Sequence, residues 1–372
     1  MATRICRISK RVRPQLGGIE NHVYFLSLCQ QQMNHDITLV VPRVPKSLLD
    51  NEIRVHRVSS FVLTPMAGKN LPSRFAETIK IILFAMSVLV FCLKSVKRNP
   101  YQIIHAHGDR SMAFVVWFVS RIIRRKSILT VHSGLDNSLD SFFNFIYTLP
   151  DVLIGVSDKI RDQLREMTGR EERIFSVSSG VMPEFYQHDE PKYQSSTKVC
   201  FVGRLRPSKG VRYLVGAIDI VRRSNPNIHA DIIGYGIALE SLRNLVKERG
   251  MENHISFHTD LETEAVIRIL KQSAVFVMPS ITISSDSTEG RPTAIMEALS
   301  LGIPVIGTNV GGIPELIEEE KNGLIVNEKD ERALAAAISR ILDDESLQKE
   351  MRKNAFRSSR NFSWPSITRR VL

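Results

Sequence analysis

The chain has 372 residues, more than one hydrophobic core usually supports, so we expect two domains. Hydrophobic residues (43%) and charged residues (24%) occur in the proportions of an ordinary globular protein, which excludes a disordered chain. The net charge of +11 predicts an anionic partner, and because no nucleic-acid motif occurs, an anionic substrate or a membrane surface is favoured over nucleic acid.

The first segment of chemical interest is a strand followed by a glycine loop. Residues 4–9 (RICRIS) predict a strand, and a helix is expected over residues 19–32, after a loop that contains Gly17 and Gly18. A strand, a glycine turn and a helix N-terminus can together bind a phosphate. Glycines are common at turns, so this segment alone is also compatible with an ordinary connection.

The most hydrophobic stretch follows two further predicted strands. Residues 81–93 (IILFAMSVLVFCL) are fewer than the roughly 20 apolar residues that a membrane span needs. We favour a buried helix here. A membrane-dipping element is the alternative, because Lys94, Lys97 and Arg98 follow directly.

Histidines mark the next two predicted strands. Residues 102–107 place His105 and His107 on one face of a strand, but without a third ligand we do not expect a metal site. Residues 127–132 predict a strand that ends at His132. The carboxyl end of a parallel strand is where α/β folds place their chemistry, although a core histidine is an equal alternative at this position.

A basic cluster ends the apolar helix expected between these two strands, over residues 111–123. The cluster consists of Arg121, Arg124, Arg125 and Lys126. Such residues stabilise a helix C-terminus, and they also attract anionic lipid. The sequence leaves both explanations open.

The α/β pattern restarts after a polar stretch at residues 188–197, which has the composition of a linker. A strand at residues 198–202 precedes the loop GRLRPSKG, in which Arg204 and Lys209 face a predicted helix N-terminus. Two fixed cations there can neutralise a diphosphate, although a solvated basic loop is the plainer alternative. The later Gly-Tyr-Gly at residues 234–236 lacks the third glycine of a dinucleotide fingerprint.

The most informative stretch is residues 289–312 (EGRPTAIMEALSLGIPVIGTNVGG). Pro292 suits the first position of a helix that ends before Gly302. Backbone amides at residues 290–294 would then form an anion site at the positive end of the helix dipole. Glu289 precedes this site, and Glu297 lies roughly 6–9 Å along the helix from it. A glutamate among apolar residues needs a partner, which favours a ligand-binding role for Glu297.

This stretch resembles glycosyltransferase family 4. The resemblance rests on Glu289-Gly290, Ala294-Ile-Met-Glu297-Ala-Leu, Gly302-Ile-Pro-Val and Gly311-Gly-Ile-Pro-Glu315, and on the Gly-Arg-Leu…Lys-Gly element at residues 203–210. It implies the GT-B fold, an α/β architecture of two Rossmann-like domains that face each other across a cleft. It also implies retaining transfer from a nucleotide sugar, with both glutamates touching the donor.

The resemblance also assigns the site residues. The catalytic candidates are His132, from a Thr-x-His segment, Glu289, Arg204 and Lys209. The donor-binding candidates are Gly17, Gly18, Arg204, Lys209, Glu289, Gly290, Arg291, Pro292, Thr293 and Glu297. Ser178-Ser179-Gly180-Val181 stands where the family usually has Pro-Asn-Gly-Val, and this departure weakens the assignment of a hinge residue at Ser179.

The same resemblance divides the chain. Residues 1–187 are expected to form an acceptor-binding domain and residues 188–355 a donor-binding domain. Residues 356–372 are expected to form a helix that crosses back to the first domain.

The expected activity is that of a metal-independent hexosyltransferase. It would act on a glycan or lipid-linked acceptor in surface polysaccharide, lipopolysaccharide or glycolipid biosynthesis, with no cofactor apart from the nucleotide-sugar donor. No Asp-x-Asp metal motif occurs. A GT-B-fold nucleotide-sugar epimerase and a non-catalytic sugar-nucleotide-binding subunit are the alternatives. A nicotinamide dehydrogenase is disfavoured, because this chain lacks the glycine fingerprint that such enzymes carry.

The cysteines and the N-terminus favour a cytoplasmic protein. Cys6, Cys29, Cys92 and Cys200 form no CxxC pair, so we expect reduced, buried side chains. No apolar signal region follows Met1. Attachment to the inner face of the plasma membrane is the further expectation, because the net charge is positive.

Overall fold

A computed structural model describes residues 2–10, 18–42, 52–58, 73–96, 100–132, 141–186, 196–283 and 290–371. The chain divides into two compact units, one comprising residues 1–179 with 367–372 and the other residues 180–366. The sequence placed this boundary at residues 187 and 188. The expected linker at residues 188–197 lies mostly outside the described residues.

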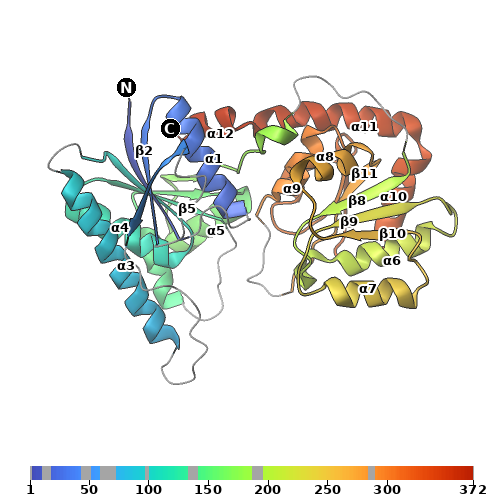
Figure 1. The fold of residues 1–372 in the computed structure, drawn as a ribbon, viewed down its shortest axis with the longest axis horizontal. Coiled ribbons are helices and arrows are strands. Elements are labelled where there is room, and N and C mark those ends of the chain that lie inside the picture. The colour runs from blue at the N-terminus through green and yellow to red at the C-terminus, as the bar shows by residue number, and fades with distance from the viewer. Residues whose placement is uncertain are drawn as a thin grey trace. The chain divides into compact units, whose positions relative to one another are not determined.

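The first unit consists of a parallel sheet and the helices that connect its strands (Figure 1). Its strands are β1 Arg4–Ser9, β2 Asp36–Pro42, β3 Arg54–Val58, β4 Ile103–His107, β5 Lys126–Val131, β6 Val152–Gly155 and β7 Ile174–Ser176. Its helices are α1 Gly18–Gln32, α3 Ser73–Val96, α4 Arg110–Ile123, η1 Ser141–Thr148 and α5 Asp158–Thr168.

The second unit repeats this plan. Its strands are β8 Lys198–Val202, β9 His229–Ile233, β10 Ile255–His258, β11 Val275–Met278, β12 Val305–Thr308 and β13 Gly323–Val326. Its helices and helical turns are η2 Pro183–Phe185, η3 Pro207–Lys209, α6 Val211–Val221, α7 Leu239–Glu248, α8 Thr263–Lys271, α9 Thr293–Ser300, η4 Pro314–Leu316, α10 Glu331–Asp343, α11 Glu345–Ser358 and η5 Ser359–Phe362. Helix α12, Trp364–Val371, begins in this unit and ends in the first.

Both sheets have the Rossmann strand order. The first runs β3-β2-β1-β4-β5-β6-β7 and the second β10-β9-β8-β11-β12-β13, with parallel pairing between neighbouring strands. Central strands such as β11 are buried along their whole length, because helices cover both faces of a parallel sheet. The prediction of two Rossmann-like α/β domains is therefore confirmed.

Helix α3 differs from its predicted form. It has 24 residues, and its window Thr78–Ser95 is long and apolar enough to cross a membrane, with only 28% of that window buried. Phe84, Val88 and Cys92 pack in the core. Six apolar residues, which we call the α3 stripe, are instead 41–47% exposed: Ile79, Ile82, Leu83, Met86, Val90 and Leu93. The prediction of a buried helix is wrong for this face, because a helix packed on one sheet buries only one side.

Two smaller predictions also need correction. Helix α9 begins at Thr293, and Pro292 is its N-cap, because the Pro292 ψ of 123° is extended. Strand β13 was not predicted, since its four residues resemble any short apolar run. The four cysteines are free and buried, as expected.

Close backbone packing fixes Gly180, the first residue of the second unit. A Cβ at this position would lie 2.7 Å from the indole ring of Trp364, and the neighbouring Val181 amide donates to the Phe362 carbonyl at 2.9 Å. The Gly-Val pair of the chain is thus seated against the start of α12. Only a residue without a side chain fits here.

We predict that Gly180→Ala lowers the free energy of unfolding by about 1–3 kcal/mol, because the added methyl overpacks the indole ring. Thermal unfolding measures this effect. Gly18→Ala is the control, since a Cβ there meets nothing within 4 Å, and its effect should stay within about 0.5 kcal/mol. Equal melting points for Gly180→Ala and the parent chain would contradict the packing argument.

Candidate functional site

In the second unit, candidate residues gather at the carboxyl edge of the sheet. The strand order reverses between β8 and β11, and loops that leave neighbouring strands at such a point form the usual ligand crevice of an α/β sheet. The loop after β8 carries Arg204 and Lys209, and the loop after β11 leads into α9.

Backbone contacts hold these loops together. Gly210 has φ +62°, and a Cβ there would lie 1.9 Å from the Pro279 carbonyl oxygen. The Ile281 amide donates to the Ser208 carbonyl at 2.8 Å. The loop that carries the cations is therefore fixed against the loop after β11. In this setting Arg204 is exposed and Lys209 is half-buried.

A third loop joins them from β9. The Leu205 amide donates to the Tyr235 carbonyl at 2.8 Å, and a Cβ on Gly236 would lie 2.3 Å from the Leu205 oxygen. The side chains of Tyr235 and Ile237 are exposed here. Sequence analysis assigned no role to this Gly-Tyr-Gly turn, and the exposure of Tyr235 and Ile237 became apparent only in the fold.

The start of α9 lies beside an ion pair. Arg291 Nε is 2.8 Å from Glu315 Oε2, and both side chains are largely buried, at 13% and 17% exposure. This pairing ties the segment before the helix to η4, which suggests that Arg291 positions the Gly290–Thr293 backbone. The first amides of the helix have no intrahelical acceptor, as at any helix start.

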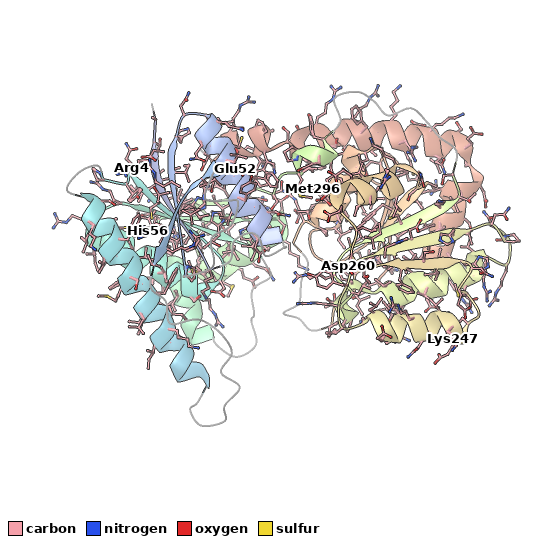
Figure 2. The ribbon with its side chains drawn as sticks, in the orientation of Figure 1. Arg4, Glu52, His56, Lys247, Asp260 and Met296 are labelled. Carbon is pink, nitrogen blue, oxygen red and sulfur yellow. The ribbon has the colours of Figure 1, made fainter. Side chains whose placement is uncertain are left out.

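Glu297 lies in the second turn of α9. Its side chain is only 9% exposed, and its neighbour Met296, labelled in Figure 2, is fully buried. Burial, and to a lesser degree the charge of Glu184, raises the pKa of Glu297 to about 7. Burying a carboxyl without a compensating cation costs folding free energy. The presence of Glu297 at this buried position therefore points to a ligand-binding role.

Three of the predicted positions lie at the limits of the described residues or outside them. Glu289 and Gly17 lie outside the described residues, so their predicted roles stay predictions. Gly18 is the first residue of α1, with open space beside it. None of the described residues imposes a glycine at this position.

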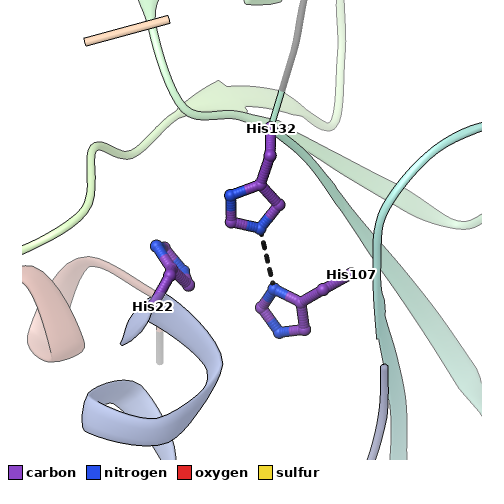
Figure 3. Close-up of side chains that lie close together, drawn as sticks. All are labelled: His22, His107 and His132. Carbon is purple, nitrogen blue, oxygen red and sulfur yellow. Dashed lines mark hydrogen bonds between the residues drawn. The ribbon is translucent and has the colours of Figure 1, made fainter. Parts of the chain in front are cut away.

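In the first unit, His132 belongs to a histidine cluster at the carboxyl ends of β4 and β5 (Figure 3). His107 Nδ1 lies 3.2 Å from His132 Nε2, and the His22 ring, from α1, lies 4.7 Å from that of His132 between ring centroids. The ring of His105 stacks on that of His107 at 4.3 Å. His22 and His107 had no predicted role, because the contact of α1 with these strands is not visible in the sequence.

Burial keeps the cluster neutral. It lowers the pKa of His132 to about 3 and the pKa values of His22, His105 and His107 well below their ordinary value. The buried Arg7 guanidinium contributes to the shift in the last three. At neutral pH, His132 can therefore donate or accept a hydrogen bond without carrying charge.

Arg7 is itself unusual. It is fully buried, and its guanidinium donates to Ser27 Oγ at 2.7 Å and to Gln30 Oε1 at 2.5 Å, both neutral groups. Burial lowers its pKa to about 9. The protein interior next to the histidines therefore carries a positive charge.

Comparisons with known proteins agree with this architecture. The sequence model for "Glycosyl transferases group 1" matches residues 184–358, and that for "Glycosyltransferase Family 4" matches residues 16–185. Each therefore describes one half of the chain.

Named relatives carry the same description. A putative colanic acid biosynthesis glycosyltransferase of Escherichia coli, WcaL, is 31% identical over 60% of this chain and 58% of its own length, so less than two thirds of that relative is matched. An uncharacterized glycosyltransferase of Methanocaldococcus jannaschii is 22% identical over 94% and 92% of the two chains. The structure of Anabaena HepE in complex with UDP has the same fold, with a TM-score of 0.78, 17% identity, and coverage of 99% and 98%.

The raised pKa of Glu297 predicts a pH-dependent stability. The folded state holds this proton between about pH 4.5 and 7 while the unfolded state has lost it, so stability falls as the pH rises through this window. In the parent protein, the free energy of unfolding should fall by about 2 kcal/mol between about pH 5 and pH 8 because of this group, and Glu297→Gln should remove that fall. Urea unfolding at several pH values measures this.

The exposed Glu248 provides the control, and Glu248→Gln should leave the pH dependence unchanged. A parent protein and a Glu297→Gln variant with parallel pH profiles would show that Glu297 ionises normally.

Proposed function

Because the chain belongs to the glycosyltransferases, whose group 1 and family 4 models together match residues 16–358, we propose that it transfers a sugar from a nucleoside diphosphate sugar to a glycan or lipid-linked acceptor. The observation that carries the proposal is the buried carboxyl of Glu297 on α9, in the same unit as the cationic loop after β8. The activity is that of a retaining hexosyltransferase of family 4 type.

The donor binds at the carboxyl edge of the second sheet. Its diphosphate lies against the backbone amides of Gly290, Arg291 and Thr293, with Lys209 and Arg204 supplying positive charge. Glu297 accepts hydrogen bonds from the ribose hydroxyls, and Glu289 accepts them from the sugar. Tyr235 offers an exposed ring for the base. Arg291 acts indirectly, through its ion pair with Glu315.

Catalysis then consists mainly of stabilising the leaving group. Negative charge develops on the departing diphosphate, where Arg204, Lys209 and the helix amides are already oriented. Neutral His132 donates or accepts a hydrogen bond at the reacting sugar. The proposed reaction retains the anomeric configuration and uses no metal ion, since these protein groups supply the charge.

Binding of the donor should be detected as thermal stabilisation by one nucleoside diphosphate without added metal. Lys209→Ala and Glu297→Ala should each weaken binding at least tenfold, because each loses a charged contact with the ligand. The measurement is a melting-point titration across UDP, GDP, ADP and their sugars. UDP comes first, since the Anabaena neighbour binds it.

Arg206→Ala is the matched control, because Arg206 is an exposed arginine of the same loop with no proposed contact. Its affinity should equal that of the parent. A shift with NAD(H) and with no nucleoside diphosphate would instead overturn the transferase proposal.

The acceptor side of the proposal rests on the surface of the first unit. The α3 stripe extends from Ile79 to Leu93, about 21 Å along the helix. Helices α3 and α4 pack together. Helix α3 precedes β4 in the chain, α4 precedes β5, and these two strands pair with each other. The exposed cations Lys94, Arg121, Arg124, Arg125 and Lys126 therefore gather at one edge of the sheet.

An apolar stripe with cations at one end has the character of a surface that docks on an anionic membrane. We therefore place the protein in the cytoplasm, peripherally bound to the inner face of the plasma membrane, where a lipid-linked acceptor would be found. The WcaL relative, named for colanic acid biosynthesis, favours a surface polysaccharide as the product.

Leu83→Asp and Val90→Asp should each reduce partition onto phosphatidylglycerol vesicles about tenfold, because a charge then replaces an apolar side chain that would contact the lipid. Vesicle co-sedimentation at low and high salt measures this. Phe175→Asp is the control, since Phe175 is a similarly exposed apolar residue of the same unit outside the stripe. Absence of vesicle binding by the parent protein at every salt concentration would refute the membrane surface.

A further inference from the structure

Three histidines of the first unit surround a common point (Figure 3). His22 comes from α1, His107 from the end of β4 and His132 from the residue after β5. One ring nitrogen of each lies within 4.8 Å of those of the other two. The three rings converge from segments that are far apart in the sequence, which the pattern at His105 and His107 alone did not predict.

His107 provides a second, independent observation. Its Nδ1 faces His132 Nε2 at 3.2 Å, while its Nε2 is buried and has no hydrogen-bond partner among the residues that the structure describes. Buried polar nitrogens are nearly always satisfied, so such a nitrogen calls for a ligand or a rearranged ring. A cation held where the three rings converge would bind the lone pair of one His107 nitrogen.

We propose that His22, His107 and His132 form a binding site for a single transition-metal dication of the Zn²⁺ class. Three neutral imidazoles with one remaining open position are a common zinc environment, with nitrogen–metal distances of about 2.0–2.1 Å. Nitrogen donors favour Zn²⁺, Co²⁺, Ni²⁺ and Cu²⁺ over Mg²⁺ and Ca²⁺, which prefer oxygen. The rings need to approach by about 1 Å to complete the site.

The surroundings orient the ligands and limit the affinity. His22 Nδ1 contacts Ser179 Oγ at 2.8 Å, and His105 Nε2 contacts Thr130 Oγ1 at 2.8 Å behind His107. Such outer contacts fix ring orientation. The buried Arg7 guanidinium repels a cation, so binding is weaker than at a structural zinc site.

The site has a functional consequence that rests on the proposed function. Metal bound to His132 would occupy the ring that we place at the reacting sugar. A transition metal would therefore inhibit transfer, in contrast to enzymes that need one. Because binding is measured without donor or acceptor, its outcome is independent of whether the transferase proposal holds.

The test is a titration of the full chain with Co²⁺, followed by visible absorption. We expect about one equivalent of Co²⁺ with the intense d–d bands of a four- or five-coordinate ion, no thiolate charge-transfer band, and displacement by Zn²⁺. His22→Gln and His107→Gln should each abolish these bands. His254→Gln, in the second unit, should retain them, since His254 lies outside the cluster and contacts the Ile228 carbonyl.

Melting curves without metal check that each variant is folded. The parent protein supplies a measurement free of any substitution, because Zn²⁺ should raise its melting point and a chelator should reverse the rise. If the parent protein shows only the spectrum of hexaaqua Co²⁺, the proposed site is overturned. Bands that persist in folded His22→Gln would overturn it as well.

Discussion

Close approach of backbone to backbone is the constraint on which the proposed donor site depends. A Cβ at Gly234 would lie 1.9 Å from the Gly203 oxygen, and one at Gly210 would lie 1.9 Å from the Pro279 oxygen, so both positions exclude side chains. Their positive φ values, +144° and +62°, are also costly for other residues. The loops after β8, β9 and β11 are thereby joined through main-chain contacts.

Burial of ionisable groups is the second theme, and it appears in both units. Glu297 has a raised pKa, and the four clustered histidines have lowered ones, because desolvation disfavours charge in each case. Arg7 remains buried against neutral partners. Each group costs stability in the absence of a ligand. This cost is the expected signature of sites whose groups are satisfied when substrate or metal binds.

The sequence predicted most of the elements, because long apolar periods and glycine turns are local signals. Strands β1 and β8 coincide with their predicted bounds, residues 4–9 and 198–202. It could not predict which face of α3 would remain uncovered, since the periodicity shows that a helix is amphipathic and not what packs against it. The same reason explains why Glu315 was quoted in a motif without a role. Its ion pair with Arg291 joins segments 24 residues apart.

The sequence by itself determined the two α/β domains, the family resemblance and the positions of Arg204, Lys209 and Glu297, because these follow from order and spacing along the chain. Tertiary structure alone decided the charge state of Glu297 and the union of His22 with His107 and His132. Burial and contact depend on segments that meet only in the folded state. Strands β2 to β5 lie between His22 and His132 in the chain, yet the two rings lie 4.7 Å apart. Local pattern carries no record of such contacts, because the packing of one element on another is set by the whole sheet.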